Sequence, residues 1–407
     1  MANDTKGQSS SRRKFLKTSA VGVSLGLAGC SAENGQSTGD GQSGGGSTTS
    51  SDGQSGGGNT TSRSDRPKLT FAQAPVGIFA MTAQHLRDTG LLEQYMDEAG
   101  YDYELRETWD GPTLYASNNV DLFQGNPMEA VRLADAQGIK STTFGKTMRF
   151  IDGIHMDASA DHTIRETGSA KATMQALAED NAVFGFAGWQ SGDIPFHIRL
   201  LNEWGIPFGP DADTPFQMQN TSNESVAQLL VRGDVTIGNI GPHIPGYVEQ
   251  ILPEIKILPV YTIAEMATEV GYEAPLMFNS FTCRQESFEE HREGYVAFAK
   301  AMKEAFQFRK EEAEKIKQWD NIKDFTGQKT DRQNSFYIDW MDGKDLSAKY
   351  GEKYELWEHD RGYWTNPYLT DEIIAAHKKF IDDSVDLGYM MKDWRDYVEM
   401  KQVDEIK

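Results

Sequence analysis

The chain has 407 residues and a formal net charge of −21 at pH 7. An acidic surface repels the phosphate backbone of nucleic acids, so the charge argues against nucleic-acid binding. The two cysteines exclude a disulfide framework, and the length allows a body of two lobes.

Residues 1–30 have the pattern of an export signal. The basic stretch SRRKFLK, which contains Arg12 and Arg13, precedes an apolar run at residues 21–28. This run is far shorter than the roughly 20 residues that a membrane span needs. SRRKFLK resembles the twin-arginine export motif, and LAGC, which ends at Cys30, resembles the lipobox in which the cysteine is lipidated. We therefore predict a twin-arginine lipoprotein signal with its lipid on Cys30.

Residues 31–65 are almost entirely Gly, Ser, Thr, Gln, Asn and Asp. Such a segment has no apolar side chains to bury and is predicted to be a disordered tether between the anchor and the body. Its composition, with the acidity of the chain, resembles that of proteins from halophilic archaea. With Cys30 lipidated, Cys283 has no partner, and we expect it to be a small buried packing residue rather than a nucleophile.

The first part of the body alternates between strand and helix patterns. Strands are predicted at residues 67–74, 101–108 and 119–124, and a fourth strand follows residue 138. Helices are predicted at 78–97, with a break at 90–92, after the loop 109–113, and at 128–137. This alternation favours a mainly parallel sheet flanked by helices.

The unit then repeats, and a helical region follows. We predict strands at 182–187 and 235–240 and helices at 194–203 and 225–232, with a loop at 188–193. Together these elements predict a second α/β lobe and a cleft between the two lobes. Apolar residues between 288 and 306 lie on one helical face, and residues 373–387 are predicted to form a last amphipathic helix. The charged run 309–317 is predicted to be a solvated helix.

These residues resemble the substrate-binding proteins of ABC importers in the nitrate, sulfonate, taurine and thiamine-precursor group. The matching pieces include NNVDLFQGNPMEAVRLADAQGI at 118–139, LLVRGDVTIGNIGPHIPGYV at 229–248 and the segment 364–391. The resemblance implies an α/β, two-lobed periplasmic-binding-protein fold of type II. Lobe 1 would comprise 66–145 and 280–407, and lobe 2 would comprise 146–279, with a hinge between them. Residues 179–181 and an apparent insertion at 311–342 depart from the family pattern.

In such sheets ligands lie outside the carboxyl ends of the strands, so the loops after the strands are the predicted binding site. The candidate ligand-binding residues are Pro75, Trp109, Asp110, Thr113, Gln124, Asn126, Trp189, Gln190, Ser191, Gly192, Asn239 and His243.

Each candidate has a functional and a structural interpretation. Ser191, Gly192 and Thr113 could donate to an oxyanion at a helix start, or Ser191 could simply cap its helix. Trp109 and Trp189 could enclose a planar ligand, or pack in the core. Asp110 would favour an amine, a zwitterion or an aminopyrimidine over a bare anion, unless it is a helix cap.

The polar candidates complete this set. Gln124, Asn126, Gln190 and Asn239 could supply neutral hydrogen bonds, and His243 could touch the ligand or serve the loop. His155 and His162 with the aspartates between them suggest a metal, but no second cluster supports one. We predict no metal and no cofactor.

The predicted function is that of an extracytoplasmic solute-binding lipoprotein anchored to the cytoplasmic membrane. As a monomer, it would capture a nitrate-, sulfonate- or taurine-like solute by hinge closure and deliver it to the permease and ATPase subunits of an ABC importer. Two alternatives have the same fold: an aminopyrimidine binder, and a ligand-sensing lipoprotein without a permease. An extracellular hydrolase is disfavoured, because the body at residues 66–407 has no Gly-x-Ser-x-Gly and no His-Glu-x-x-His motif, and no catalytic residue is predicted. Matches such as GQSTG at 35–39 lie in the low-complexity tether.

Overall fold

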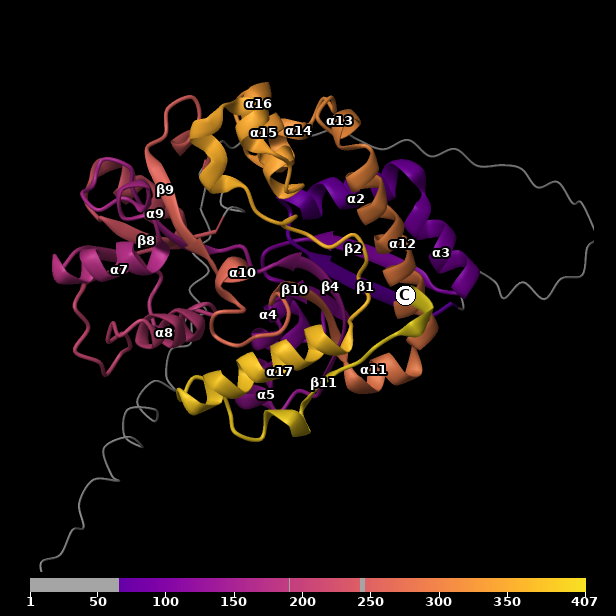
Figure 1. Cartoon of the computed structure of the whole chain (residues 1–407). Helices are drawn as coiled ribbons and strands as arrows, with labels where there is room; N and C mark the ends of the chain where they lie inside the picture. The colour runs from indigo at the N-terminus through magenta and orange to yellow at the C-terminus, as the bar shows by residue number, and fades with distance from the viewer. Residues whose placement is uncertain (1–65, 190, 242–245) are drawn as a thin grey trace, which may run out of the picture. The chain divides into compact units, whose positions relative to one another are not determined.

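The computed structural model describes residues 66–189, 191–241 and 246–407, and their strands form two separate sheets (Figure 1). The six-stranded sheet has the order β11-β4-β10-β3-β1-β2, and the five-stranded sheet has the order β7-β6-β8-β5-β9. In the first sheet β10 runs against its neighbours, and in the second β5 does. The predicted α/β class with mainly parallel sheets is confirmed.

The six-stranded sheet combines the start of the body with its C-terminal part. Its strands are β1 (Lys68–Gln73), β2 (Asp102–Glu107), β3 (Leu122–Gly125), β4 (Ser141–Arg149), β10 (Met277–Arg284) and β11 (Val398–Met400). The helices of this lobe are α2 (Gly77–Thr89), α3 (Leu91–Ala99), α4 (Gly111–Ala116), α5 (Pro127–Gln137), α11 (Gln285–Glu290), α12 (Arg292–Glu311) and α17 (Asp371–Asp386).

The apolar faces of these elements explain why they pack together. Leu69 and Phe71 of β1 lie in one buried cluster with Phe298 of α12, and the rings of Phe71 and Phe298 stack at 4.2 Å. Ala72 and Phe123 lie in a second buried cluster with Tyr115 of α4. Because successive side chains of a strand point to opposite faces, the sheet is covered by helices on both sides.

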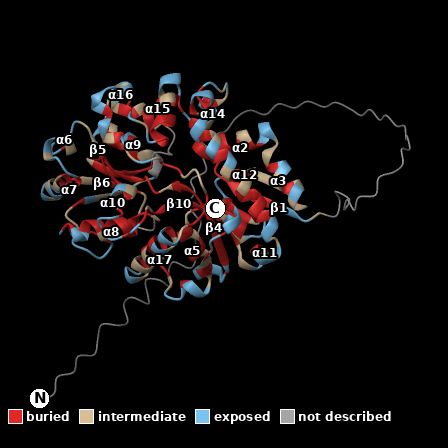
Figure 2. Ribbon diagram, turned by 45° about the vertical axis from the view of Figure 1, so that its right-hand side comes forward, coloured by how far each residue is buried: buried red, intermediate tan, exposed pale blue. Residues whose placement is uncertain are grey.

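The five-stranded sheet uses one continuous part of the chain. Its strands are β5 (Gly153–Asp157), β6 (Val183–Phe186), β7 (Gln217–Asn220), β8 (Ile237–Ile240) and β9 (Ile257–Thr262). The helices are α6 (Ile164–Thr167), α7 (Ala170–Glu179), α8 (Ile194–Glu203), α9 (Asn223–Arg232) and α10 (Ile263–Met266), with the 3-10 turn η2 (Val248–Gln250). Figure 2 shows that buried residues concentrate in the strands and on the inner helix faces of both lobes.

A helical segment after α12 contacts both lobes. It contains α13 (Ala313–Ile316), α14 (Ile322–Thr326), α15 (Asp331–Met341), α16 (Leu346–Tyr350) and the 3-10 helix η3 (Glu352–Trp357). Figure 1 shows α14 beside α2 of the first lobe, and α15 packs against η2 of the second. The indole nitrogen of Trp357 donates to the hydroxyl of Tyr247 at 3.2 Å, and the rings of Tyr247 and Trp340 stack at 5.1 Å. One buried apolar cluster therefore includes residues of both lobes and of this segment.

Two 3-10 turns, η4 (Trp394–Asp396) and η5 (Asp404–Ile406), flank β11 near the C-terminus. Among the described residues, no helix combines the length and the apolar character that crossing a bilayer requires.

The predicted solvated helix at 309–317 is only partly correct, since residues 310, 311, 314 and 315 are helical and exposed but both ends of the run are buried. The side chain of Arg309 is 3% exposed, and its guanidinium lies over the rings of Tyr363 and Phe306 at 4.1 and 4.7 Å. Lys317 is also buried and donates to the carboxylate of Asp339 at 2.5 Å. Charged side chains enter the interior here because aromatic faces and a carboxylate replace the water that they lose. The expectation that Cys283 is buried is confirmed.

Candidate ligand-binding site

The strands place two sets of loops where a ligand would be held. β1, β2 and β3 are parallel, so the loops at Pro75, at Trp109 and Asp110, and at Asn126 follow carboxyl ends at the same edge of the six-stranded sheet. β6 and β8 are also parallel, and the loop 187–193 and the segment after Ile240 follow their carboxyl ends. These are the positions at which open α/β sheets bind ligands.

The loop after β3 and the loop after β6 meet across the two lobes. The side-chain nitrogen of Asn126 lies 3.9 Å from the position that a Cβ on Gly192 would occupy. Asn126 also caps α5, because its side-chain oxygen accepts from the amide of Met128 at 2.9 Å, and Pro127 takes the first helical position. The amide of Asn126 is thus fixed by its own helix and directed to the other lobe.

A buried polar network lies next to this meeting point in the five-stranded lobe. The side-chain amide of Asn239, at the end of β8, donates to the carboxylate of Asp193, which precedes α8. The Nε2 atom of His197 lies 3.5 Å from the same carboxylate, and its Nδ1 lies 3.0 Å from the hydroxyl of Tyr261. Burial by itself raises the pKa of Asp193, but the nearby side chains of His197 and Ser191 outweigh it. The pKa of this carboxyl therefore lies below its ordinary value, and the group is charged at neutral pH.

A second hydrogen-bonded chain lies at the edge of the six-stranded sheet. The side-chain nitrogen of Gln73 donates to the carbonyl of Phe79 at 2.9 Å, and that of Gln124 donates to the side-chain oxygen of Gln73 at 2.9 Å. Gln73 and Gln124 come from neighbouring strands and are both buried. This chain holds Gln124 in one orientation beside the first turn of α2.

Charged groups of α5 lie near the network of Asp193. Burial raises the pKa of Glu129 to about 7, against the nearby charge of Arg132 and a hydrogen bond from the main chain of Asn126. Burial also lowers the pKa of Arg132, and the carboxylates of Glu129 and Asp193 oppose that shift. Because Arg132 belongs to one lobe and Asp193 to the other, their attraction acts across the lobes.

The candidates predicted from the sequence have different surroundings in the structure. Gln124 and Asn239 are buried, Asn126 and Gly192 approach each other, and the side chain of Ser191 is hydrogen-bonded to Asp193. Ser191 does not cap α8, because the residue that precedes this helix is Asp193 and the helix has no side-chain cap. Pro75 is partly exposed in its loop.

The two tryptophans differ in exposure. Trp109 is 50% exposed, whereas Trp189 packs on Phe186 and Phe208 with ring centroids 4.9 and 5.2 Å apart. Asp110 and Thr113 are exposed at the start of α4, and the side chain of Asp110 makes no capping hydrogen bond there. A ligand held between the two rings stays a prediction. Gln190 and His243, with Arg12, Arg13 and Cys30, lie outside the described residues.

The members of these networks that the sequence analysis missed include Gln73, Asp193, His197 and Glu129. Asp193 was visible as the last residue of the loop before α8, and Gln73 as a polar residue at the end of a strand. A search for amides at the ends of apolar strands finds Gln73, and a search for carboxylates just before helices finds Asp193. His197 and Glu129 lie within helices, and only the packing of the lobes brings them to the site.

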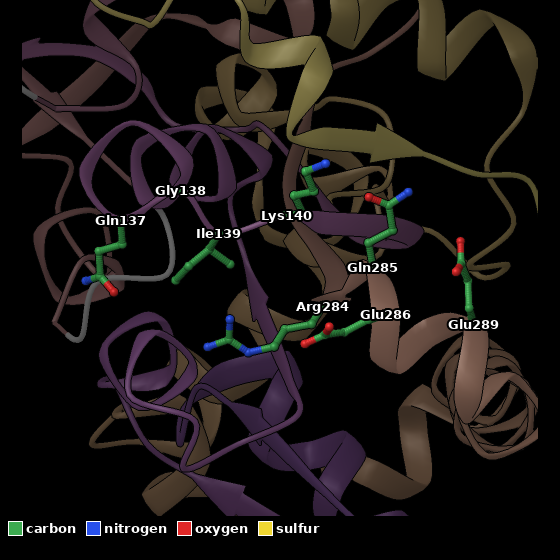
Figure 3. A pocket seen from close by; sticks show the side chains of 8 residues that line it. All are labelled: Gln137, Gly138, Ile139, Lys140, Arg284, Gln285, Glu286 and Glu289. Atoms are coloured by element: carbon green, nitrogen blue, oxygen red, sulfur yellow. The ribbon is translucent and has the colours of Figure 1, made fainter.

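A surface pocket of about 480 Å³ lies elsewhere. Figure 3 shows its lining residues, which come from the segment between α5 and β4 and from the end of β10 and the start of α11. Lys140 precedes β4 and Arg284 ends the antiparallel β10, so both lie at the edge opposite the carboxyl ends of β1 to β3. This pocket is therefore separate from the strand-end loops.

No group of three or more His, Cys, Asp or Glu side chains within 66–189, 191–241 and 246–407 could hold a metal ion. His155 accepts from the hydroxyl of Tyr247 at 2.6 Å and lies 3.2 Å from the carbonyl of Gly153. Both ring nitrogens of His155 are therefore used within the fold.

Two α/β lobes with facing strand-end loops define a fold class, that of the periplasmic binding proteins. No protein-family model matches the sequence, and no curated protein is significantly similar to it. Solved structures show the likeness at low sequence identity, so it establishes the fold alone.

The similar structures include the periplasmic aliphatic sulphonate-binding protein SsuA of Escherichia coli. It has 13% identity and a TM-score of 0.55, and the match covers 81% of this chain and 97% of that protein. The ligand-binding component of an ABC-type import system from Staphylococcus aureus has 11% identity and a TM-score of 0.52, with 84% and 99% covered. The alkanesulfonate-binding protein SsuA of Xanthomonas axonopodis pv. citri has 12% identity and a TM-score of 0.51, with 82% and 98% covered.

Proposed function

We propose that this protein is an extracytoplasmic lipoprotein that binds a small solute between its two lobes and passes it to an ABC importer. The observation that carries the proposal is the meeting of Asn126 and Gly192, which come from the strand-end loops of different lobes. Polar groups from both lobes are buried beside this point. A solute bound there would touch both lobes at once.

The mechanism follows from contacts that exist only when the lobes are together. The chain crosses between the sheets after Arg149, where β4 ends, and again before Met277, where β10 begins. A solute that bonds to both lobes stabilises the closed arrangement by the difference between its affinities for the closed and open states. The permease would then recognise the closed form.

The solute class that the sequence suggests is nitrate, a sulfonate or a taurine-like compound, with an aminopyrimidine as the alternative. The similar structures whose names mention sulfonates support the first group. The buried carboxylate of Asp193 beside the loops favours the members of these groups that carry an amine.

A thermal-shift screen of the purified protein tests this function. The solutes are nitrate, bicarbonate, taurine, alkyl sulfonates and aminopyrimidines, and sodium chloride at equal ionic strength is the control for general salt effects. A solute that binds only the folded protein stabilises it by about 2.7 kcal/mol at about one hundred times its Kd. This corresponds to a rise in melting temperature of several degrees. If every solute gives the same melting temperature as the salt control, the proposal fails.

A further inference from the structure

Three buried acceptor oxygens beside the strand-end loops receive no hydrogen bond from any described residue. They are Oε1 of Gln124, Oδ1 of Asn239 and Oδ1 of Asp193. The three residues are 6%, 3% and 4% exposed. Leaving one buried polar atom without a partner costs about 1–3 kcal/mol, so three such atoms beside two meeting loops require a reason.

The hydrogen bonds of the two amides fix which atom is left over. A carbonyl can only accept, so the bond from Gln73 to the carbonyl of Phe79 turns the side-chain oxygen of Gln73 toward Gln124. Gln124 must then donate its nitrogen and keep its oxygen free. The charged carboxylate of Asp193 likewise takes the nitrogen of Asn239 and leaves the oxygen of Asn239 free. All three free atoms are therefore acceptors.

The cations at the same edge already have partners. Lys146 donates to the carbonyl of Tyr368, and Arg149 pairs with Asp360 at 2.9 Å. The charge of Arg132 interacts with those of Glu129 and Asp193. Nε of Arg149 and the ring nitrogen Nε2 of His197 also lack a hydrogen-bond partner, but the charge of Arg149 is paired and Nε2 of His197 faces Asp193 at 3.5 Å. The polar atoms that are left for a solute at this edge are therefore mainly acceptors.

We infer that the solute presents N–H donors to Gln124, Asn239 and Asp193, so that an amine-bearing solute binds in preference to a bare anion. This inference rests on the proposed function and narrows its solute class. A protonated alkylamine, as in an amino-sulfonate, and the amino group of an aminopyrimidine share this chemistry. The solute would supply the missing hydrogen bonds when the lobes close, and a nitrate or simple sulfonate group could not.

Matched solutes test the inference on the purified full-length protein by isothermal titration calorimetry. Taurine is compared with propane-1-sulfonate, in which a methyl group replaces the ammonium group. 4-Amino-5-hydroxymethyl-2-methylpyrimidine is compared with its 4-methyl counterpart. A hydrogen bond to a buried or charged acceptor corresponds to about tenfold or more in affinity, so the amine member of one pair should bind at least about tenfold more tightly. The pair that shows this difference identifies which amine chemistry is used.

A variant locates the effect in the structure. Asp193→Asn should weaken the preferred amine by about tenfold or more and leave its methyl partner unchanged, because only the amine uses the charge. The matched control is Asp234→Asn in the same lobe, since the side chain of Asp234 is 50% exposed. If Asp193→Asn does not fold, the comparison of matched solutes on the unaltered protein still decides the matter.

The outcomes separate this inference from the function on which it rests. If propane-1-sulfonate or nitrate binds as tightly as the amines, the inference is overturned and the solute-binding function stands. If no solute of the screen binds, the proposed function fails and the inference fails with it. An undiminished amine affinity in a folded Asp193→Asn variant also overturns the inference.

Discussion

Acid should destabilise the fold through His155, which lies in β5 between β8 and β9. Its ring is 2% exposed, and burial lowers its pKa to about 4 from 6.5. The unfolded chain therefore binds more protons than the folded chain when the pH falls below about 6.5. The stabilising effect of the neutral ring is fully present above the unfolded pKa and is lost as the pH falls toward the folded pKa.

The expected size follows from these two pKa values. Between pH 7.5 and pH 5.0, the titration of His155 alone should remove about 2 kcal/mol from the free energy of unfolding. His155→Gln removes this titration, so the variant should lose about 2 kcal/mol less than the unaltered protein over the same pH interval. Urea unfolding followed by tryptophan fluorescence at both pH values measures the difference, whatever the variant costs at neutral pH.

The control is His162→Gln, since the side chain of His162 is 45% exposed and its replacement removes no buried ring. This variant keeps the buried ring of His155 and should therefore still show the loss of about 2 kcal/mol that its titration causes. An equal loss in His155→Gln and in the unaltered protein would refute the reasoning, because it would mean that burial does not suppress protonation of His155.

Three further changes test other parts of the structure. Gly153→Ala should destabilise the fold by about 1–3 kcal/mol or more, as measured by urea unfolding. The reason is that the new Cβ would collide with the main chain of β9, which cannot move aside as a side chain can. A loss of stability under about 0.5 kcal/mol would contradict this. Cys30→Ser should move the protein from the membrane fraction to the soluble fraction, and retention in the membrane fraction would argue against the lipid anchor. Trp109→Ala or Trp189→Ala should weaken binding of the best solute of the thermal screen by about tenfold, as expected for the loss of an aromatic contact. Trp319→Ala, between α13 and α14, is the control, and unchanged affinity in both test variants would remove the predicted ring contacts.

Much of the fold could be predicted from local patterns in the sequence. The helix predicted at 194–203 coincides with α8, because Pro195 marks its start and its apolar residues follow the helical period. The break predicted near residue 90 is real, since Gly90 has φ of 66° and ends α2. These elements have signals that are complete within a few neighbouring residues.

Other elements could not be predicted in this way. β7 (Gln217–Asn220) reads QMQN and lies at the edge of its sheet, so it lacks the apolar alternation of a half-buried strand. β5 contains His155, whose buried neutral state depends on partners far away in the sequence. The sequence predicts a solvated Arg309, because an aromatic ring that covers it, that of Tyr363, belongs to a distant segment of the chain.

The candidate site shows the same division. The position of Gln124 and Asn239 at the ends of apolar strands could be predicted, because strand ends are visible in the sequence. The burial of Asp193 could not be predicted from the sequence, since it depends on Asn239, which is distant in the chain, and on the neighbouring lobe. The approach of Asn126 to Gly192 is likewise a property of the packing of lobes.

The strand order also has a consequence for the growing chain on the ribosome. The five-stranded sheet uses residues 153–262 without interruption, whereas the six-stranded sheet takes β10 from 277–284 and its edge strand β11 from 398–400. The lobe that is translated first therefore cannot close until residue 400 has emerged, and the lobe translated second can be finished earlier. Until that moment the nascent chain carries an open edge on β4, which a chaperone would have to shield.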